Sequence, residues 1–253
     1  MLTPDIIALA HQLHGLRLEN RQVPTHQLTS MPSMIEDALE VQREFSKLEG
    51  ADTSAWKVAK SPDGSPVVAP LHPYQDAAPY AALPWRTGMK IEVEIAVRLD
   101  KDLPVRTDKV YERSDIEAAI SDAYLGAELV WSGIAEGGSV SFPAFLADRL
   151  GNAGYIRGPA IPLEALQPGS SIPLKLWLNK QIAYDDTAQH PSKDVLSWLC
   201  DYANDRTRLV SSLRAGTIIT TGSLCGALHV TDPGEISAQL GVDAVLSFTL
   251  SSS

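Results

Sequence analysis

The sequence predicts an α+β fold, in which a helical segment at residues 1–50 packs on a mixed β domain at residues 51–253. Two observations indicate this division. Apolar residues recur every three or four positions in the first fifty residues, which is the period of a helix with one buried face. From Trp56 onward the chain consists mainly of short β-rich runs that glycine and proline separate, as strands and turns require.

Four helices are expected. The first follows Thr3 and Pro4, a capping residue and a first-turn proline, and the second follows Pro32 and ends at Gly50. Two more interrupt the β domain. A Ser-Asp-Ile-Glu capping pattern predicts one over residues 114–122, and apolar spacing predicts the other over residues 191–204.

Eight β-rich runs predict the strands of the second domain. They cover residues 55–59, 90–99, 123–132, 153–158, 173–178, 216–221, 225–230 and 244–250. Turn residues lie between several of them, as in the Asp-Pro-Gly sequence at 232–234. These runs contain no internal repeat, so we expect one sheet-rich unit.

Acidic residues occupy two of these runs. Glu92 and Glu94 share one face of the strand at 90–99, because strand side chains alternate, and Glu128 lies in the run at 123–132. Carboxylates in an apolar strand are usually paired or bound to a metal, although a solvated sheet face gives the same spacing. Three carboxylates suit a hard cation such as Mg²⁺ or Mn²⁺.

Charge and composition exclude several classes of protein. The net charge of −10 disfavours nucleic acid as a partner, since phosphate binding needs basic patches. No apolar run reaches 18 residues and residues 1–16 lack a secretory signal pattern, so we expect neither a membrane span nor export. Cys200 and Cys225 are far apart, which favours a reduced, cytoplasmic setting.

Several ordered blocks carry a family resemblance. They are Ala-Trp-Lys-Val-Ala at 55–59, Ile-Glu-Val-Glu-Ile-Ala at 91–96, Lys-Asp-Leu-Pro at 101–104, Gly-Ala-Glu-Leu-Val at 126–130, the segments 146–148 and 154–158, and Leu-Arg-Ala-Gly-Thr-Ile-Ile-Thr-Thr-Gly-Ser at 213–223. In this order they resemble the 2-keto-4-pentenoate hydratase branch of the fumarylacetoacetate hydrolase superfamily. The resemblance implies a mixed β-sheet roll of the fumarylacetoacetase C-terminal-like type with flanking helices.

The resemblance also implies a site. Residues matching Glu92, Glu94 and Glu128 would bind Mg²⁺ or Mn²⁺, which would polarise the 2-oxo group of a small anionic 2-oxo acid. Lys57 would neutralise the substrate carboxylate or donate a proton, although without the family resemblance a surface lysine beside Trp56 is the favoured interpretation. Ser223 with the Gly222 backbone would bind the substrate carboxylate, where sequence alone suggests a turn serine.

Three further candidates depend on looser matches to the family. Asp76 and Asp148 are candidate catalytic acids or bases by resemblance, and solvated acids by default. Leu71 lies in the loop after Lys57 that is expected to contact the substrate.

The resemblance implies hydration of a 2-hydroxypenta-2,4-dienoate-like or 2-oxo-enoate substrate, in the catabolism of aromatic or related compounds. The segments near Lys60, Trp131 and Arg149 depart from the family's usual residues and leave alternatives open. These are a 2-oxo-3-enedioate (4-oxalocrotonate-type) decarboxylase or a C–C hydrolase, and a non-catalytic partner subunit. We expect a homo-oligomer, alone or with a decarboxylase or hydratase partner.

Overall fold

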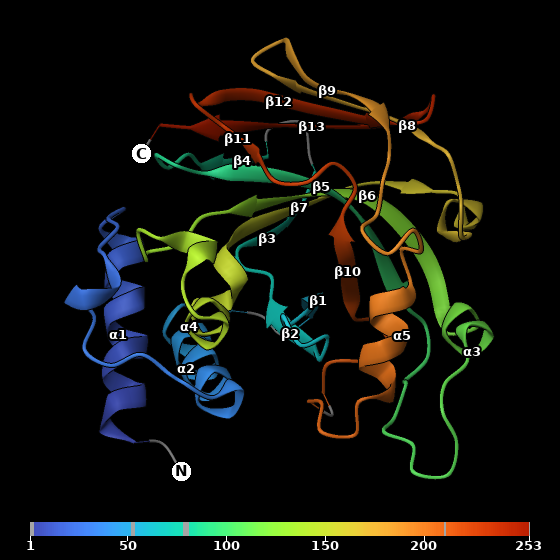
Figure 1. The fold of residues 1–253 in the computed structure, drawn as a ribbon. Coiled ribbons are helices and arrows are strands. Elements are labelled where there is room, and N and C mark those ends of the chain that lie inside the picture. The colour runs from blue at the N-terminus through green and yellow to red at the C-terminus, as the bar shows by residue number, and fades with distance from the viewer. Residues whose placement is uncertain (1–2, 52–53, 78–80, 210, 253) are drawn as a thin grey trace.

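The computed structural model describes residues 3–51, 54–77, 81–209 and 211–252, and their strands form two sheets (Figure 1). The larger sheet has the order β2-β1-β10-β5-β6-β7-β3, with β11 also paired to β5. The second sheet has the order β4-β13-β12-β8-β9 and packs against the first, since β13 contacts β6 and β7. This mixed α+β architecture is the predicted fold class.

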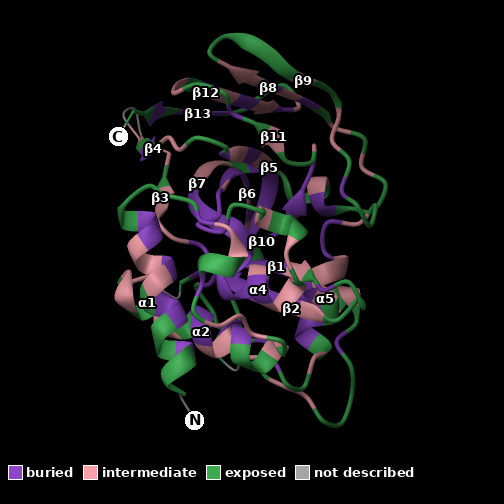
Figure 2. Ribbon diagram, turned by 60° about the vertical axis from the view of Figure 1, so that its left-hand side comes forward, coloured by how far each residue is buried: buried purple, intermediate pink, exposed green. Residues whose placement is uncertain are grey.

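The strands of the larger sheet are β1 (Ala55–Lys60), β2 (Pro66–Pro70), β3 (Tyr74–Asp76), β5 (Lys90–Leu99), β6 (Ile120–Val130), β7 (Asn152–Ile161), β10 (Ile218–Ser223) and β11 (Leu228–His229). Those of the second sheet are β4 (Ala82–Pro84), β8 (Pro173–Leu178), β9 (Gln181–Thr187), β12 (Gly234–Leu240) and β13 (Ala244–Ser251). Buried residues gather in the central strands of the larger sheet (Figure 2).

The helices are α1 (Pro4–Leu18), α2 (Ile35–Leu48), α3 (Arg113–Glu117), α4 (Phe142–Ala147) and α5 (Ser197–Asn204). The Thr3 hydroxyl accepts a hydrogen bond from the Ile6 amide and caps α1, as the sequence predicted. Helices α1 and α2 lie together on the side away from the second sheet (Figure 1). Their apolar faces share a buried cluster with β2 and α4, which joins the N-terminal segment to the β domain. No helix within the described residues has the length and apolar character needed to cross a membrane.

Two of the predicted helices were too long. The one expected at residues 114–122 ends at Glu117, because Ile120 and Asp122 pair with β5 as the beginning of β6. Its capping box uses Glu112 and Asp115 instead of the predicted pattern. The helix expected at residues 191–204 begins at Ser197, because Asp194 accepts the Leu196 amide and holds the preceding residues in a turn. In both cases tertiary contacts override the local pattern.

Among the described residues, five strands and one α-helix were not predicted. They are β2, β3, β4, β9, β12 and α4. β3 and β4 are only three residues long and pair with β7 and β13 from distant parts of the chain. Strands this short carry no period that a sequence can reveal.

Candidate metal centre

Three carboxylates converge on one face of the larger sheet. Glu92 and Glu94 project from the same face of β5, and Glu128 on β6 lies directly opposite Glu92 in the antiparallel register. One carboxylate oxygen from each lies within 4.8 Å of the others. Glu94 is 1% exposed and Glu128 is 0% exposed, so the alternative of a solvated sheet face is wrong.

The charges of the buried cluster are only partly compensated by the protein. Burial raises the pKa of Glu92, and burial with the charge of Glu128 raises the pKa of Glu94 well above its usual range. Glu94 Oε2 and Glu128 Oε2 are buried and have no hydrogen-bond partner among the described residues. Buried carboxylate oxygens of this kind are satisfied by a proton or a cation. The oxygen-only donor set therefore fits a hard divalent cation.

Lys57 adds a positive charge to the cluster of three carboxylates. It lies on β1 and is 8% exposed, and its Nζ is 2.6 Å from Glu128 Oε1. Burial alone would lower the pKa of this amine, but the charges of Glu128, Glu92 and Glu94 raise it more, and the net shift is upward. Lys57 is therefore a buried ammonium at neutral pH, and the surface-lysine alternative is wrong.

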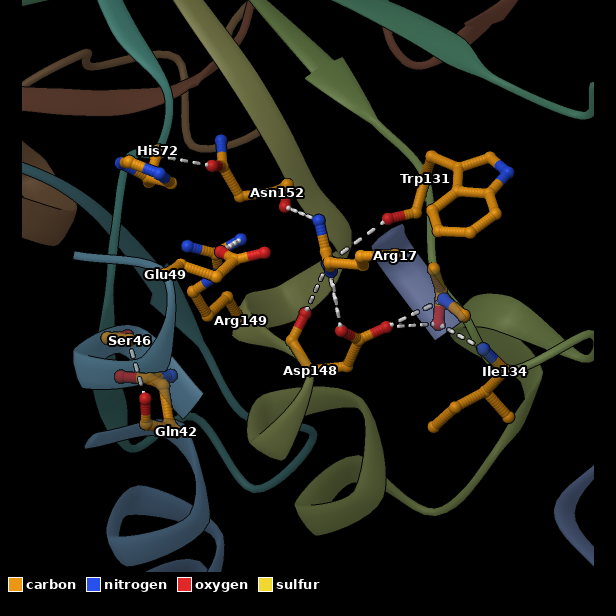
Figure 3. A network of polar contacts seen from close by, with 12 residues as sticks. Arg17, Gln42, Ser46, Glu49, His72, Trp131, Ile134, Asp148, Arg149 and Asn152 are labelled. Carbon is orange, nitrogen blue, oxygen red and sulfur yellow. Dashed lines mark hydrogen bonds and ion pairs between the residues drawn. The ribbon is translucent and has the colours of Figure 1, made fainter. Parts of the chain in front are cut away.

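Asn152 also holds Glu128, through the same carboxylate oxygen as Lys57. Figure 3 shows Asn152 with His72, Arg17 and Asp148 around it. Asn152 Nδ2 donates to Glu128 Oε1 at 3.0 Å, and its Oδ1 accepts the His72 amide at 2.8 Å, which fixes the orientation of the side-chain amide. The Asn152 carbonyl accepts from Arg17 Nη1 of α1 at 2.6 Å. Arg17 in turn pairs with buried Asp148 at 2.8 Å. The N-terminal helix thus reaches the carboxylate cluster through two side chains.

Sequence reasoning assigned no role to Asn152 or Arg17. Arg17 lies in an ordinary helical pattern, and Asn152 lies in a segment that departs from the family's usual residues. Asn152 is 24 residues from Glu128 in the sequence, and Arg17 is 135 residues from Asn152. No local sequence pattern therefore indicates either contact.

A pocket of about 740 Å³ opens beside the cluster. Lys57, Glu92, Glu94, Gly222 and Ser223 line it, as the sequence analysis expected of a site. Ser223 lies opposite Glu94 in the β10–β5 pairing, and its hydroxyl donates to the Gly226 carbonyl at 3.0 Å. Gly222 has φ +117, and a Cβ there would lie 2.9 Å from His190 Nε2, so a larger residue would disturb this wall.

The other three candidates lie outside the pocket lining. Asp76 is exposed and pairs with Arg157 at 2.7 Å. Asp148 is fully buried and accepts from Arg17 and from the Ser132 hydroxyl, so it is not a solvated acid. Leu71 is buried in a small apolar cluster. The structure gives these residues structural partners and does not bring them to the carboxylates.

The chain was compared with known proteins. The model of the fumarylacetoacetate (FAA) hydrolase C-terminal family matches residues 40–243, whereas no curated protein matches the chain. The structure of 4-oxalocrotonate decarboxylase from Pseudomonas putida G7, complexed with magnesium and adipate, aligns with a TM-score of 0.74 at 19% identity over 99% of both chains. A putative fumarylpyruvate hydrolase from Burkholderia cenocepacia aligns with a TM-score of 0.54 at 20% identity, over 79% of this chain and 88% of that one. The likeness to these structures is one of fold, and the family match shows that the chain belongs to the fumarylacetoacetate hydrolase C-terminal family.

Proposed function

We propose that the protein is a divalent-metal-dependent decarboxylase of a 2-oxo-3-enedioate. The observation that carries this proposal is the buried cluster of Glu92, Glu94 and Glu128, in which two oxygens have no hydrogen-bond partner among the residues that the structure describes. The full-length likeness in fold to a 4-oxalocrotonate decarboxylase complexed with magnesium supports decarboxylation over the hydration that the sequence first suggested.

Glu92, Glu94 and Glu128 would hold the cation, and Mg²⁺ is the candidate we favour. When bound, it would supply a Lewis acid for the substrate's 2-oxo group. Three carboxylates exceed the charge of one divalent cation by one unit, which the Lys57 ammonium balances. Lys57 also lies where it stabilises negative charge that develops near the cluster, so it acts as a cation and not as a base.

The proposed reaction breaks the C5–C6 bond of a 2-oxohex-3-enedioate. The C6 carboxylate leaves as CO₂, and the electron pair moves through C4 and C3 to the oxygen on C2. Protonation of that oxygen gives 2-hydroxypenta-2,4-dienoate, and no oxidant or second substrate is needed. Val130, Phe142 and Phe145 line the pocket, and apolar walls favour a reaction that spreads a localised carboxylate charge.

The experiment offers the purified protein two substrates separately in heavy-oxygen water with Mg²⁺. Stoichiometric CO₂ from 2-oxohex-3-enedioate is the result expected. A labelled hydroxyl on C4 of the product from 2-hydroxypenta-2,4-dienoate, without CO₂ from the enedioate, would establish the hydratase instead. Tight Mg²⁺ binding without turnover of either compound would favour the non-catalytic subunit.

A further inference from the structure

Lys90 places a cation on the same strand face as the carboxylate cluster. It begins β5 two residues before Glu92, so its side chain projects with those of Glu92 and Glu94. It lines the same pocket and is partly exposed. Within the described part of the chain its side chain forms no ion pair or hydrogen bond, although its charge acts on Glu92. Lys57, in contrast, pairs with Glu128, and Lys60 pairs with Asp201.

His229 extends this basic end of the pocket. It lies on β11 directly opposite Lys90 in the antiparallel register, so the two side chains share a face. Its imidazole is exposed and also lines the pocket. Along β5, Lys90 and His229 therefore lie at the start of the strand, and the carboxylates of Glu92 and Glu94 follow two and four residues later.

The spacing between the two ends suits a short dicarboxylate. Strand geometry puts the Lys90 backbone ~7 Å from that of Glu92 and ~13 Å from that of Glu94. A six-carbon chain has five C–C bonds of ~1.5 Å each and spans ~6 Å when extended. A 2-oxo acid group at the carboxylate cluster therefore leaves the far end of such a chain within reach of the flexible Lys90 side chain.

We propose that Lys90, with His229 beside it, binds the distal carboxylate of a six-carbon dicarboxylic substrate. This inference rests on the proposed function, because it assumes that the 2-oxo acid end lies at Glu92, Glu94 and Glu128. The cluster, a divalent cation and Lys57 together are neutral, so they do not offset the two charges of a dicarboxylate. Lys90 supplies the additional cation that a dianion requires in a protein whose net charge is −10.

The position of Lys90 has a kinetic consequence. The distal carboxylate is the group that leaves as CO₂, so its negative charge decreases in the transition state. Lys90 therefore stabilises the bound substrate at least as strongly as the transition state. Lys90→Met should raise KM for the enedioate without lowering kcat, whereas a merely structural residue would lower both kcat and stability.

The direct test measures binding of two unreactive ligands by calorimetry in the presence of Mg²⁺. The ligands are 2-oxohexanedioate and 2-oxohexanoate, which differ only in the distal carboxylate. We expect the wild type to bind the dicarboxylate about tenfold more tightly, as one charge-assisted contact provides. Lys90→Met should abolish this preference and leave affinity for 2-oxohexanoate within about twofold. Lys90→Arg should retain it.

The matched control is Lys180→Met, which removes the same charge from an exposed turn between β8 and β9. This variant should keep the wild-type preference. Equal affinity of the wild type for both ligands, or a preference that survives Lys90→Met, would overturn the assignment. The preference does not depend on turnover, so a protein that prefers the dicarboxylate but releases no CO₂ would refute the proposed reaction and leave the role of Lys90 intact.

Discussion

Glu94→Gln should change the stability of the metal-free protein and its metal affinity in opposite directions. Burial and the neighbouring Glu128 raise the pKa of Glu94 well above its ordinary value of 4.5. The folded metal-free protein therefore holds this proton more tightly than the unfolded chain does. The stability from that proton is fully present below pH 4.5 and is lost as the pH rises through the raised pKa.

At pH 8 the neutral glutamine should restore the stability that the wild type loses at Glu94 as the pH rises. The variant neither buries a carboxylate charge nor takes up a proton on folding, so its free energy of unfolding should be higher by roughly 1–3 kcal/mol, and Tm should rise by roughly 2–4 °C per kcal/mol. The wild type should in turn gain about 2.7 kcal/mol from Mn²⁺ at one hundred times its Kd. The variant lacks one ligand oxygen, so we expect it to gain less than about 1 kcal/mol at the same Mn²⁺ concentration.

Thermal unfolding with EDTA and with Mn²⁺, together with calorimetric titration of Mn²⁺, measures both effects. The control is Glu235→Gln, which removes an exposed carboxylate that lies 3.8 Å from Lys180. Unchanged Mn²⁺ affinity in Glu94→Gln would refute the assignment of Glu94 as a ligand. A metal-free variant that is less stable than the wild type at pH 8 would refute the reasoning from its pKa.

Three other substitutions test the remaining parts of the site. Lys57→Met should raise KM and lower kcat in steady-state assays, and changes within about twofold in both constants would exclude Lys57 from binding and catalysis. Asn152→Ala should weaken Mn²⁺ binding by about tenfold in calorimetry, because Glu128 loses one of two donors on Oε1; unaltered affinity would contradict this positioning role. Arg17→Met should cost about 3–5 kcal/mol in urea unfolding, since it leaves Asp148 buried without its cation. A loss below about 1 kcal/mol would mean that Asp148 finds another partner.

The sequence determined the features that depend on neighbours along the chain. The alternation of a strand put Glu92 and Glu94 on one face, and the structure has them there on β5. The Thr3–Pro4 start of α1 and the strand β8 were predictable for the same reason, since a helix cap and the residue pattern of a strand depend on residues close together in the chain. The ordered blocks also indicated the family that residues 40–243 match.

Only the tertiary structure decided which distant residues meet these carboxylates. The pairing of β5 with β6 set Glu128 opposite Glu92, and the place of β1 beside β10 brought Lys57 to Glu128. Arg17 approaches from α1, 135 residues before the carbonyl that it binds. Strand register and helix packing fix such contacts through the burial of whole faces. The free energy of that burial is a sum over many residues, so no short stretch of sequence predicts which contacts form.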